Sequence, residues 1–118
     1  KMPDQLIFVK VDPILIEQAL FNLIENGVRH GTADTPIFLR VFQEQEVVIE
    51  IENQGEIPLG QYQKIQANLT NDTEVPVDSK NGLGIGLSIV KTIIHAHEGK
   101  LAIETKAGST IFRIYLKQ

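Results

Sequence analysis

The sequence predicts an α+β fold, a two-layer α/β sandwich in which helices cover one face of a mixed, mostly antiparallel sheet. Two segments with helical periodicity are separated by pairs of alternating, strand-like segments, in the order β-α-β-β-loop-α-β-β. Hydrophobic residues make up 42% of the chain and charged residues 22%, as in an ordinary globular protein. A length of 118 residues supports one domain, residues 1–118, and is too short for two.

The first predicted elements are a short strand and a helix. A strand-like run covers residues 6–11 and leads into Asp12 and Pro13. This pair favours a helix start, because aspartate caps free N–H groups and proline is tolerated in the first turn. Gly31 is expected to end the helix. The apolar face of this helix contains Ile16, Ala19, Leu20, Leu23 and Gly27.

Residues 35–43 and 46–54 alternate between apolar and polar side chains, which predicts an antiparallel hairpin with one buried face. Residues 55–80 lose this periodicity and predict a long polar loop with one short helix near residues 61–69. The second periodic helix follows, and its expected buried face contains Ile85, Ile89, Ile93 and Ala96. Two further strands are predicted at residues 100–106 and 109–117.

Composition excludes several classes of function. The formal net charge of −4 and the lack of a basic stripe argue against a nucleic-acid partner. The chain has no cysteine, which removes disulfides and thiolate sites. It also lacks an apolar run near 18 residues, so this segment is not expected to span a membrane. His30, His95 and His97 lack the spacing of zinc ligands, and the last two are expected to be satisfied at a helix end.

A polar stripe on the first helix is the more specific functional signal. Asn22, Asn26 and Arg29 lie within about 60° of one another around the helix, with Gln18 and Glu25 at the edge of the stripe. Polar stripes usually face solvent, but asparagine is a poor helix former and has no clear advantage there. Amide oxygens are hard ligands that suit Mg²⁺ with a phosphate, and an arginine can bind the phosphate oxygens.

Three alternating glycines precede the second helix: Gly82, Gly84 and Gly86. Glycine loses much conformational entropy on folding, so such a run is costly unless the backbone must approach something closely. The alternatives are a flexible loop and an anion site at a helix N-terminus, where free N–H groups and the helix dipole favour negative charge. The glycines alone do not decide between them.

Taken together, these segments resemble the sensor histidine kinases. The segment "NLIENGVRHG" resembles their N box, "IEIENQGEIP" stands where the G1 box does, and "NGLGIGLSIVKTIIHAHEG" is similar to the G2 box. The order of elements is also similar to the Bergerat ATP-binding (GHKL) fold of these kinases, gyrase, a heat-shock chaperone family and MutL proteins. The opening and closing segments look most like the potassium-responsive kinases of the KdpD type.

The resemblance implies Mg²⁺ and ATP as cofactors. Asn26 would be the metal ligand, while Asn22 and Arg29 would face the phosphates. Hydrolytic relatives carry a water-activating glutamate at the place of Asn22, and an amide cannot take a proton. The catalytic pair is therefore expected to be Asn22 and Asn26. The residues expected to bind the nucleotide are Asn22, Asn26, Arg29, Asn53, Gly55, Ile57, Lys80, Gly82, Leu83, Gly84, Gly86 and Leu87.

The G1 segment departs from the family pattern. Asn53 replaces the usual aspartate, and Glu56 and Ile57 stand where a second glycine is expected after Gly55. The amide keeps a carbonyl acceptor for the adenine amino group, but its hydrogen bond would lose charge assistance and about 1 kcal/mol. The long loop, which would be the ATP lid, has Tyr62 as its only aromatic residue. Both departures predict weaker nucleotide binding.

The leading hypothesis is therefore the ATP-binding catalytic domain of a two-component protein-histidine kinase. Its partners by resemblance are its own dimerisation and histidine phosphotransfer domain and a downstream response regulator. The isolated domain would be monomeric and its parent a membrane-anchored homodimer with this domain in the cytoplasm. The alternatives are a degenerate nucleotide-sensing module, an autonomous ATPase, and a dinucleotide-binding oxidoreductase, whose glycines should follow the first strand as G-x-G-x-x-G.

Overall fold

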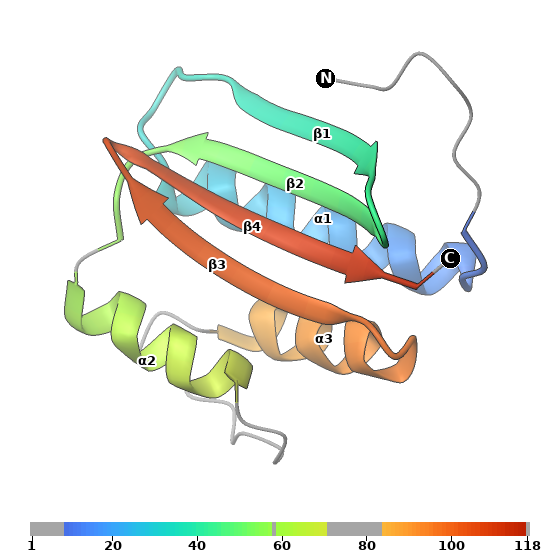
Figure 1. Cartoon of the computed structure of the whole chain (residues 1–118). Helices are drawn as coiled ribbons and strands as arrows, with labels where there is room; N and C mark the ends of the chain where they lie inside the picture. Colours follow the sequence, from blue (N-terminus) through green and yellow to red (C-terminus); the bar gives the residue numbers. More distant parts are fainter. Residues whose placement is uncertain (1–8, 58, 71–83, 118) are drawn as a thin grey trace.

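The structure, a computed structural model, describes residues 9–57, 59–70 and 84–117 (Figure 1). The described residues form three helices and four strands. They are α1 (Pro13–His30), β1 (Ile37–Gln43), β2 (Val47–Gln54), α2 (Leu59–Thr70), α3 (Gly84–Ala96), β3 (Lys100–Lys106) and β4 (Ser109–Leu116). The expected strand at residues 6–11 lies largely outside the described residues, and residues 9–11 are not in a strand. The described part contains no helix that is long and apolar enough to cross a membrane.

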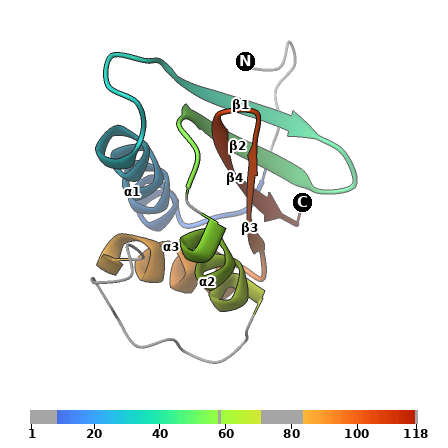
Figure 2. The same cartoon turned by 90° about the vertical axis from the view of Figure 1, so that its left-hand side faces the viewer.

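The four strands form one sheet in the order β1-β2-β4-β3, and every described pair is antiparallel. The central pair, β2 and β4, aligns Ile49 with Ile114 and Ile51 with Phe112. These side chains are buried in the same core as residues of all three helices. The helices therefore cover one face of the sheet, as the two perpendicular views show (Figures 1 and 2). The predicted two-layer α/β sandwich is confirmed.

Helix α1 begins as its sequence predicts. The Asp12 side chain caps it by accepting hydrogen bonds from the backbone N–H groups of Ile14 and Leu15, at 3.0 and 3.2 Å. The helix ends at Gly31, whose N–H donates to the Gly27 carbonyl at 2.8 Å. The expected apolar face is confirmed, because its five members are buried or half-buried.

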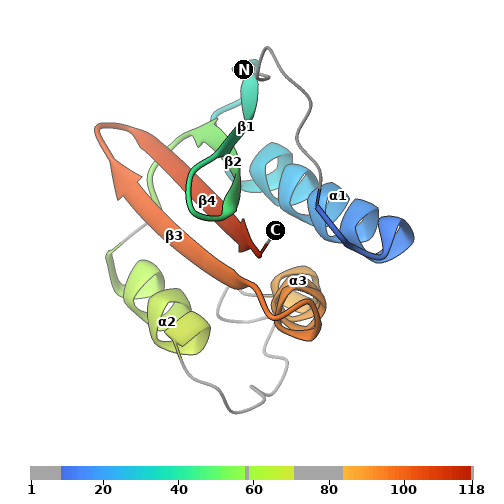
Figure 3. The same cartoon turned by 45° about the vertical axis from the view of Figure 1, so that its right-hand side comes forward.

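Helix α3 buries a different face from the expected one. Leu87, Val90 and Ile94 are buried, together with the expected Ile93. Ile89 is only half-buried and Ala96 is exposed, while the side chain of Ile85 lies outside the described ones. The reason is that α3 contacts α1 on one side and β3 on another, so its buried surface is turned toward residues 87, 90 and 94 (Figure 3).

The other face of the sheet carries a charge network across all four strands. Arg113 on β4 donates from Nε to Glu50 on β2 at 2.6 Å and from Nη1 to Glu104 on β3 at 2.7 Å. Arg40 on β1 lies 2.8 Å from Glu52 on β2, and its second contact, with Glu50, is 3.5 Å. The Glu50 and Glu52 side chains are only 13% and 16% exposed, so these pairs are shielded more than ordinary surface pairs.

These contacts lower the pKa values of two carboxyl groups in the network, those of Glu52 and Glu104. Burial raises the pKa of the Glu52 carboxyl, but hydrogen bonds from Arg40 and Ser109 outweigh it and leave that pKa below its ordinary value. A hydrogen bond from Arg113 lowers the pKa of Glu104. Because folding lowers both pKa values, the folded protein holds fewer protons than the unfolded chain at mildly acid pH.

We therefore expect the free energy of unfolding to fall as the pH drops from about 5 through the lowered pKa values of the folded state. Arg113→Met should lower it by about 1.5 kcal/mol at pH 7 and flatten the acid dependence, because two charge-assisted hydrogen bonds are lost. Urea denaturation between pH 3 and 7 measures both effects. Arg29→Met is the control, since its exposed pair with Glu25 should contribute only about 0.3 kcal/mol. Equal losses of unfolding free energy in the two variants would show that the charge network stabilises the fold no more than an exposed ion pair does.

Gly99→Ala should destabilise the fold by about 2 kcal/mol, in the range of overpacking changes. A Cβ on Gly99 would lie 2.5 Å from the Tyr115 carbonyl oxygen and 3.1 Å from side-chain atoms of Ile94 and Leu116. The carbonyl belongs to β4 and cannot move without disturbing the sheet. In the control, Gly60→Ala, the new Cβ meets no atom within 4 Å, and helix propensity should raise stability by up to about 1 kcal/mol. Thermal and urea unfolding of both variants would check this difference in sign.

Candidate functional site

Helices α1 and α3 lie side by side and run in opposite directions (Figures 1 and 3). Ala19 and Leu23 of α1 and Val90 of α3 are almost completely buried in the shared core. At one end of the pair, the backbone N–H of Asp12 donates to Nε2 of His97, just after α3, at 3.0 Å. The start of α1 is therefore held against the end of α3.

This hydrogen bond gives a common reference point from which positions along the axes of the two antiparallel helices can be compared. With a rise of about 1.5 Å per residue, Asn22 and Asn26 lie about 15 and 21 Å from Asp12 along α1. Gly86 and Gly84 lie about 16 and 20 Å from His97 along α3. The structure therefore brings the first turn of α3 level with the two asparagines that the sequence singled out.

Asn22 and Asn26 are both partly buried rather than exposed. The Nδ2 atom of Asn22 is buried and has no hydrogen-bond partner among the described residues. Leaving such a donor unpaired costs about 1–3 kcal/mol, so a ligand that supplies an acceptor would remove a real penalty. Phosphate oxygens are acceptors of this kind, and the neighbouring amide of Asn26 offers the hard oxygen that Mg²⁺ prefers. The pair thus fits a metal–phosphate ligand chemically.

Arg29 is placed differently from the asparagines. It is exposed, and its Nη2 atom lies 3.3 Å from Oε1 of Glu25, one turn earlier on the same helix. An exposed pair of this type contributes little and is easily exchanged. The Arg29 guanidinium therefore contacts Glu25 rather than the partly buried Asn22 or Asn26.

Asn53 lies at the end of β2 against the C-terminal half of α1. It is 7% exposed, and its Nδ2 donates to the Gln54 carbonyl at 3.1 Å. A Cβ on Gly27 would lie 3.3 Å from both Cβ and Oδ1 of Asn53, so glycine allows the helix to approach the strand this closely. Since Gly27 follows Asn26 directly, the asparagine pair and Asn53 belong to one region of the molecule.

Gly55 makes the sharp turn that follows β2. Its φ of 113° is a conformation that side chains other than glycine rarely adopt. Its N–H donates to the Gly108 carbonyl at 2.6 Å, and its carbonyl accepts from Oγ1 of Thr110 at 2.7 Å. Ile57, beyond the turn, is half-buried and packs against the core. The predicted G1 residues thus form a rigid wall next to α1.

Thr110 is a residue of this wall that the sequence analysis missed. It is 2% exposed and stands directly opposite Asn53 in the β2–β4 register. The signal that could have found it is the strand alternation, which places residue 110 on the helix-facing side of β4 with Phe112 and Ile114. A polar residue at that otherwise apolar position was the cue.

Some of the remaining predicted residues lie outside the described part of the chain, and one, Leu87, lies within it. Lys80, Gly82 and Leu83 lie outside the described residues. Leu87 is 5% exposed, and its side chain belongs to the hydrophobic core. Among the described residues no cluster of histidine, cysteine and acidic side chains could hold a metal ion by itself.

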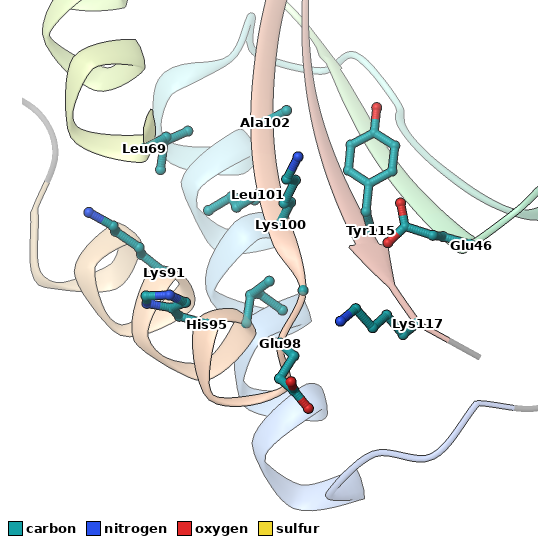
Figure 4. A pocket seen from close by; sticks show the side chains of 12 residues that line it. Glu46, Leu69, Lys91, His95, Glu98, Lys100, Leu101, Ala102, Tyr115 and Lys117 are labelled. Atoms are coloured by element: carbon teal, nitrogen blue, oxygen red, sulfur yellow. The ribbon is translucent and has the colours of Figure 1, made fainter. Parts of the chain in front are cut away.

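A separate cavity of about 870 Å³ lies at the other end of α3 (Figure 4). Lys91 and His95 of α3, Lys100 of β3 and Tyr115 of β4 are among the residues that line it. None of the described residues around it is one of the predicted site residues. The cavity is therefore distinct from the candidate site.

Among known proteins, this chain is similar to several sensor kinases. Sensor protein KdpD of Clostridium acetobutylicum is 34% identical over 95% of this chain and 13% of that protein. KdpD of Escherichia coli strain K12 is 32% identical over 99% of this chain and 13% of that protein. The adaptive-response sensory kinase SasA of a Synechococcus strain is 33% identical, over 91% and 29%. The chain thus spans less than a third of the length of each of these relatives.

Solved structures agree with this fold. One nucleotide-free form of the catalytic domain of histidine kinase ThkA has a TM-score of 0.76 at 24% identity, over 98% of this chain and 75% of that one. Another form has a TM-score of 0.71 at 26% identity, over 92% and 70%. The resemblance to sensor histidine kinases, including the KdpD type, is confirmed. Residues 11–118 match the family model, and the chain belongs to the family of histidine kinase-, DNA gyrase B- and HSP90-like ATPases, as an ATPase domain of the sensor histidine kinase kind.

Proposed function

We propose that this domain binds Mg–ATP between α1 and the start of α3 and presents the γ-phosphate to a histidine on a separate dimerisation domain. The observation that carries the proposal is the matched height of the asparagine pair and the glycine-bearing first turn of α3. Free N–H groups at a helix N-terminus favour phosphate. Family membership and the sensor kinase relatives support the same reaction.

In this proposal each part of the site has one task. Asn26 would hold Mg²⁺ through its amide oxygen, and a bound Mg²⁺ would supply the positive charge that stabilises the phosphates. The unpaired Nδ2 of Asn22 donates to a phosphate oxygen. Because neither amide can accept a proton from water, the site favours transfer of the phosphoryl group to a protein over hydrolysis. Arg29 can leave its exposed partner and bind the phosphates from the rim.

Asn53 would receive the adenine ring at the other end of the site. Its carbonyl oxygen can accept a hydrogen bond from the exocyclic amino group, and Thr110 and Gly55 hold the surrounding backbone in place. The proposal includes Lys80 and the backbone at residues 82 and 83 as further phosphate contacts. It also includes a parent protein that is a membrane-anchored homodimer with this domain in the cytoplasm, and a response regulator downstream.

One observation favours a second candidate, a nucleotide-sensing module without kinase activity. Asn53 is buried and neutral where the resemblance to the kinases leads us to expect an aspartate, and Glu56 and Ile57 stand where a second glycine is expected. Both candidates require nucleotide binding. They differ in whether a separate histidine-bearing domain becomes phosphorylated when it is added together with Mg–ATP, which is the experiment that decides between them.

One prediction of the proposed function concerns the role of Asn26 in Mg²⁺-dependent nucleotide binding. Mg–ADP at ten times its dissociation constant should raise the melting temperature by about 5 °C, which corresponds to about 1.4 kcal/mol. Asn26→Ala should remove the Mg²⁺-dependent part of this shift, because the hard amide ligand is lost. Gln18→Ala, an exposed polar change on the same helix, is the control and should keep the full shift. A wild-type domain that shows no shift at millimolar Mg–ADP would rule out the proposal.

Another prediction concerns the contact between Asn53 and the adenine base of the nucleotide. Asn53→Asp should strengthen ATP binding about fivefold, since a neutral acceptor becomes a charged one. The same change should lower the stability of the nucleotide-free domain, because it buries a carboxylate. Isothermal titration with ATP and with inosine triphosphate, which lacks the exocyclic amino group, isolates the contact. An equal gain for both nucleotides would show that Asn53 does not bind the amino group.

A further inference from the structure

We propose that His97 is a positioning residue for the nucleotide site: as a neutral imidazole it joins the end of α3 to the first turn of α1 and thereby sets the height at which the start of α3 faces Asn22 and Asn26. The inference rests on the proposed function for the identity of the ligand. It assigns a role to a residue that stands about 15 Å or more along the helices from the residues that we propose bind the ligand.

The protonation state of His97 follows from its two contacts. The Asp12 backbone N–H can only donate, so Nε2, 3.0 Å away, must be the acceptor and carry no proton. Nδ1 lies 2.8 Å from the Ile93 carbonyl oxygen, which can only accept, so Nδ1 carries the proton. The two contacts together select one neutral tautomer, and a half-buried ring held at both nitrogens has little freedom to turn.

The backbone around His97 is also fixed. The N–H of Gly99 donates to the Ile94 carbonyl at 2.9 Å, and the N–H of Glu98 donates to the His95 carbonyl at 2.9 Å. With Glu98 at a φ of 58°, this is the hydrogen-bond pattern of a Schellman motif, which closes the C-terminal end of a helix. These hydrogen bonds hold the backbone at the end of α3 in one conformation. The imidazole of His97 then connects this backbone to the start of α1.

The other end of the link is equally well defined. Asp12 is the N-cap of α1, and its carboxylate accepts from Ile14 and Leu15 while its backbone N–H donates to His97. One residue therefore both starts the helix and connects it to α3. A slip of α3 by one residue would move its first turn by about 1.5 Å, a displacement large enough to misplace a phosphate-binding backbone.

The test measures Mg–ADP binding by isothermal titration at a temperature where every variant is folded. His97→Phe keeps the ring but has no acceptor, and it should weaken binding about fivefold, the equivalent of one hydrogen bond. His97→Gln keeps an acceptor near the position of Nε2 and should stay within about twofold of the wild type. His95→Phe, a change at an exposed histidine on the last turn of α3, is the matched control and should bind as the wild type does.

Two spectroscopic readouts separate positioning from general stability. Imidazole ¹⁵N shifts of the wild type should show the tautomer with the proton on Nδ1. In His97→Phe, the amide signals of Gly84 and Gly86 and the side-chain amides of Asn22 and Asn26 should move, and His97→Gln should restore them. Should His97→Phe not fold, the tautomer and the glutamine variant still decide, because a proton on Nε2 or a fivefold loss in His97→Gln would overturn the inference.

The outcomes keep the two proposals apart. If the wild-type domain does not bind Mg–ADP, the proposed function is wrong and the positioning role falls with it. If the wild-type domain binds and all three variants bind equally well, only the role of His97 is overturned. Weaker binding in His97→Phe with recovery in His97→Gln supports both.

Discussion

The antiparallel packing of α1 against α3 is the constraint on which the candidate site depends. Both helices pack on the same face of the sheet, but this packing does not determine the position of one helix along the axis of the other. That is decided by buried contacts such as Ala19 and Val90 and by the hydrogen bond between Asp12 and His97. Because α1 carries the amides and α3 begins with the glycines, the helix pair brings two distant sequence motifs to one candidate site.

Much of the fold could be predicted from the sequence, because most of its elements are specified locally. Asp12 and Pro13 define the start of α1, and regular alternation defines the two hairpins. The face of α3 could not be predicted in the same way. The polar side chains of α3 lie along one side of the helix, at Ser88, Lys91, Thr92 and His95, and the rest of its surface is a wide apolar face. Periodicity does not fix which part of that face is buried, and only the contacts with α1 and β3 select Leu87, Val90 and Ile94.

The residues of the candidate site also separate into those that local sequence motifs indicate and those that depend on contacts between distant parts of the chain. Asn22, Asn26, Asn53 and Gly55 could be singled out from contiguous motifs, and the structure brings them to one region, while their roles in binding stay predictions. Thr110 and the contacts of His97 could not, since the first depends on strand register and the second on a partner from the far end of the chain. The Arg29 prediction stays a prediction, because the ion pair with Glu25 is a local contact that any exposed arginine can form.

The strand order has a consequence for how the chain reaches its native state. The hairpins β1–β2 and β3–β4 are local, whereas β2 pairs with β4 across the two halves of the chain. Closing such a long loop costs entropy before the pairing returns any free energy. Folding should therefore begin in the separate hairpins and be limited by the step that joins them, which also brings Asn53 opposite Thr110. The wall of the candidate site is thus completed only when the two halves of the sheet meet.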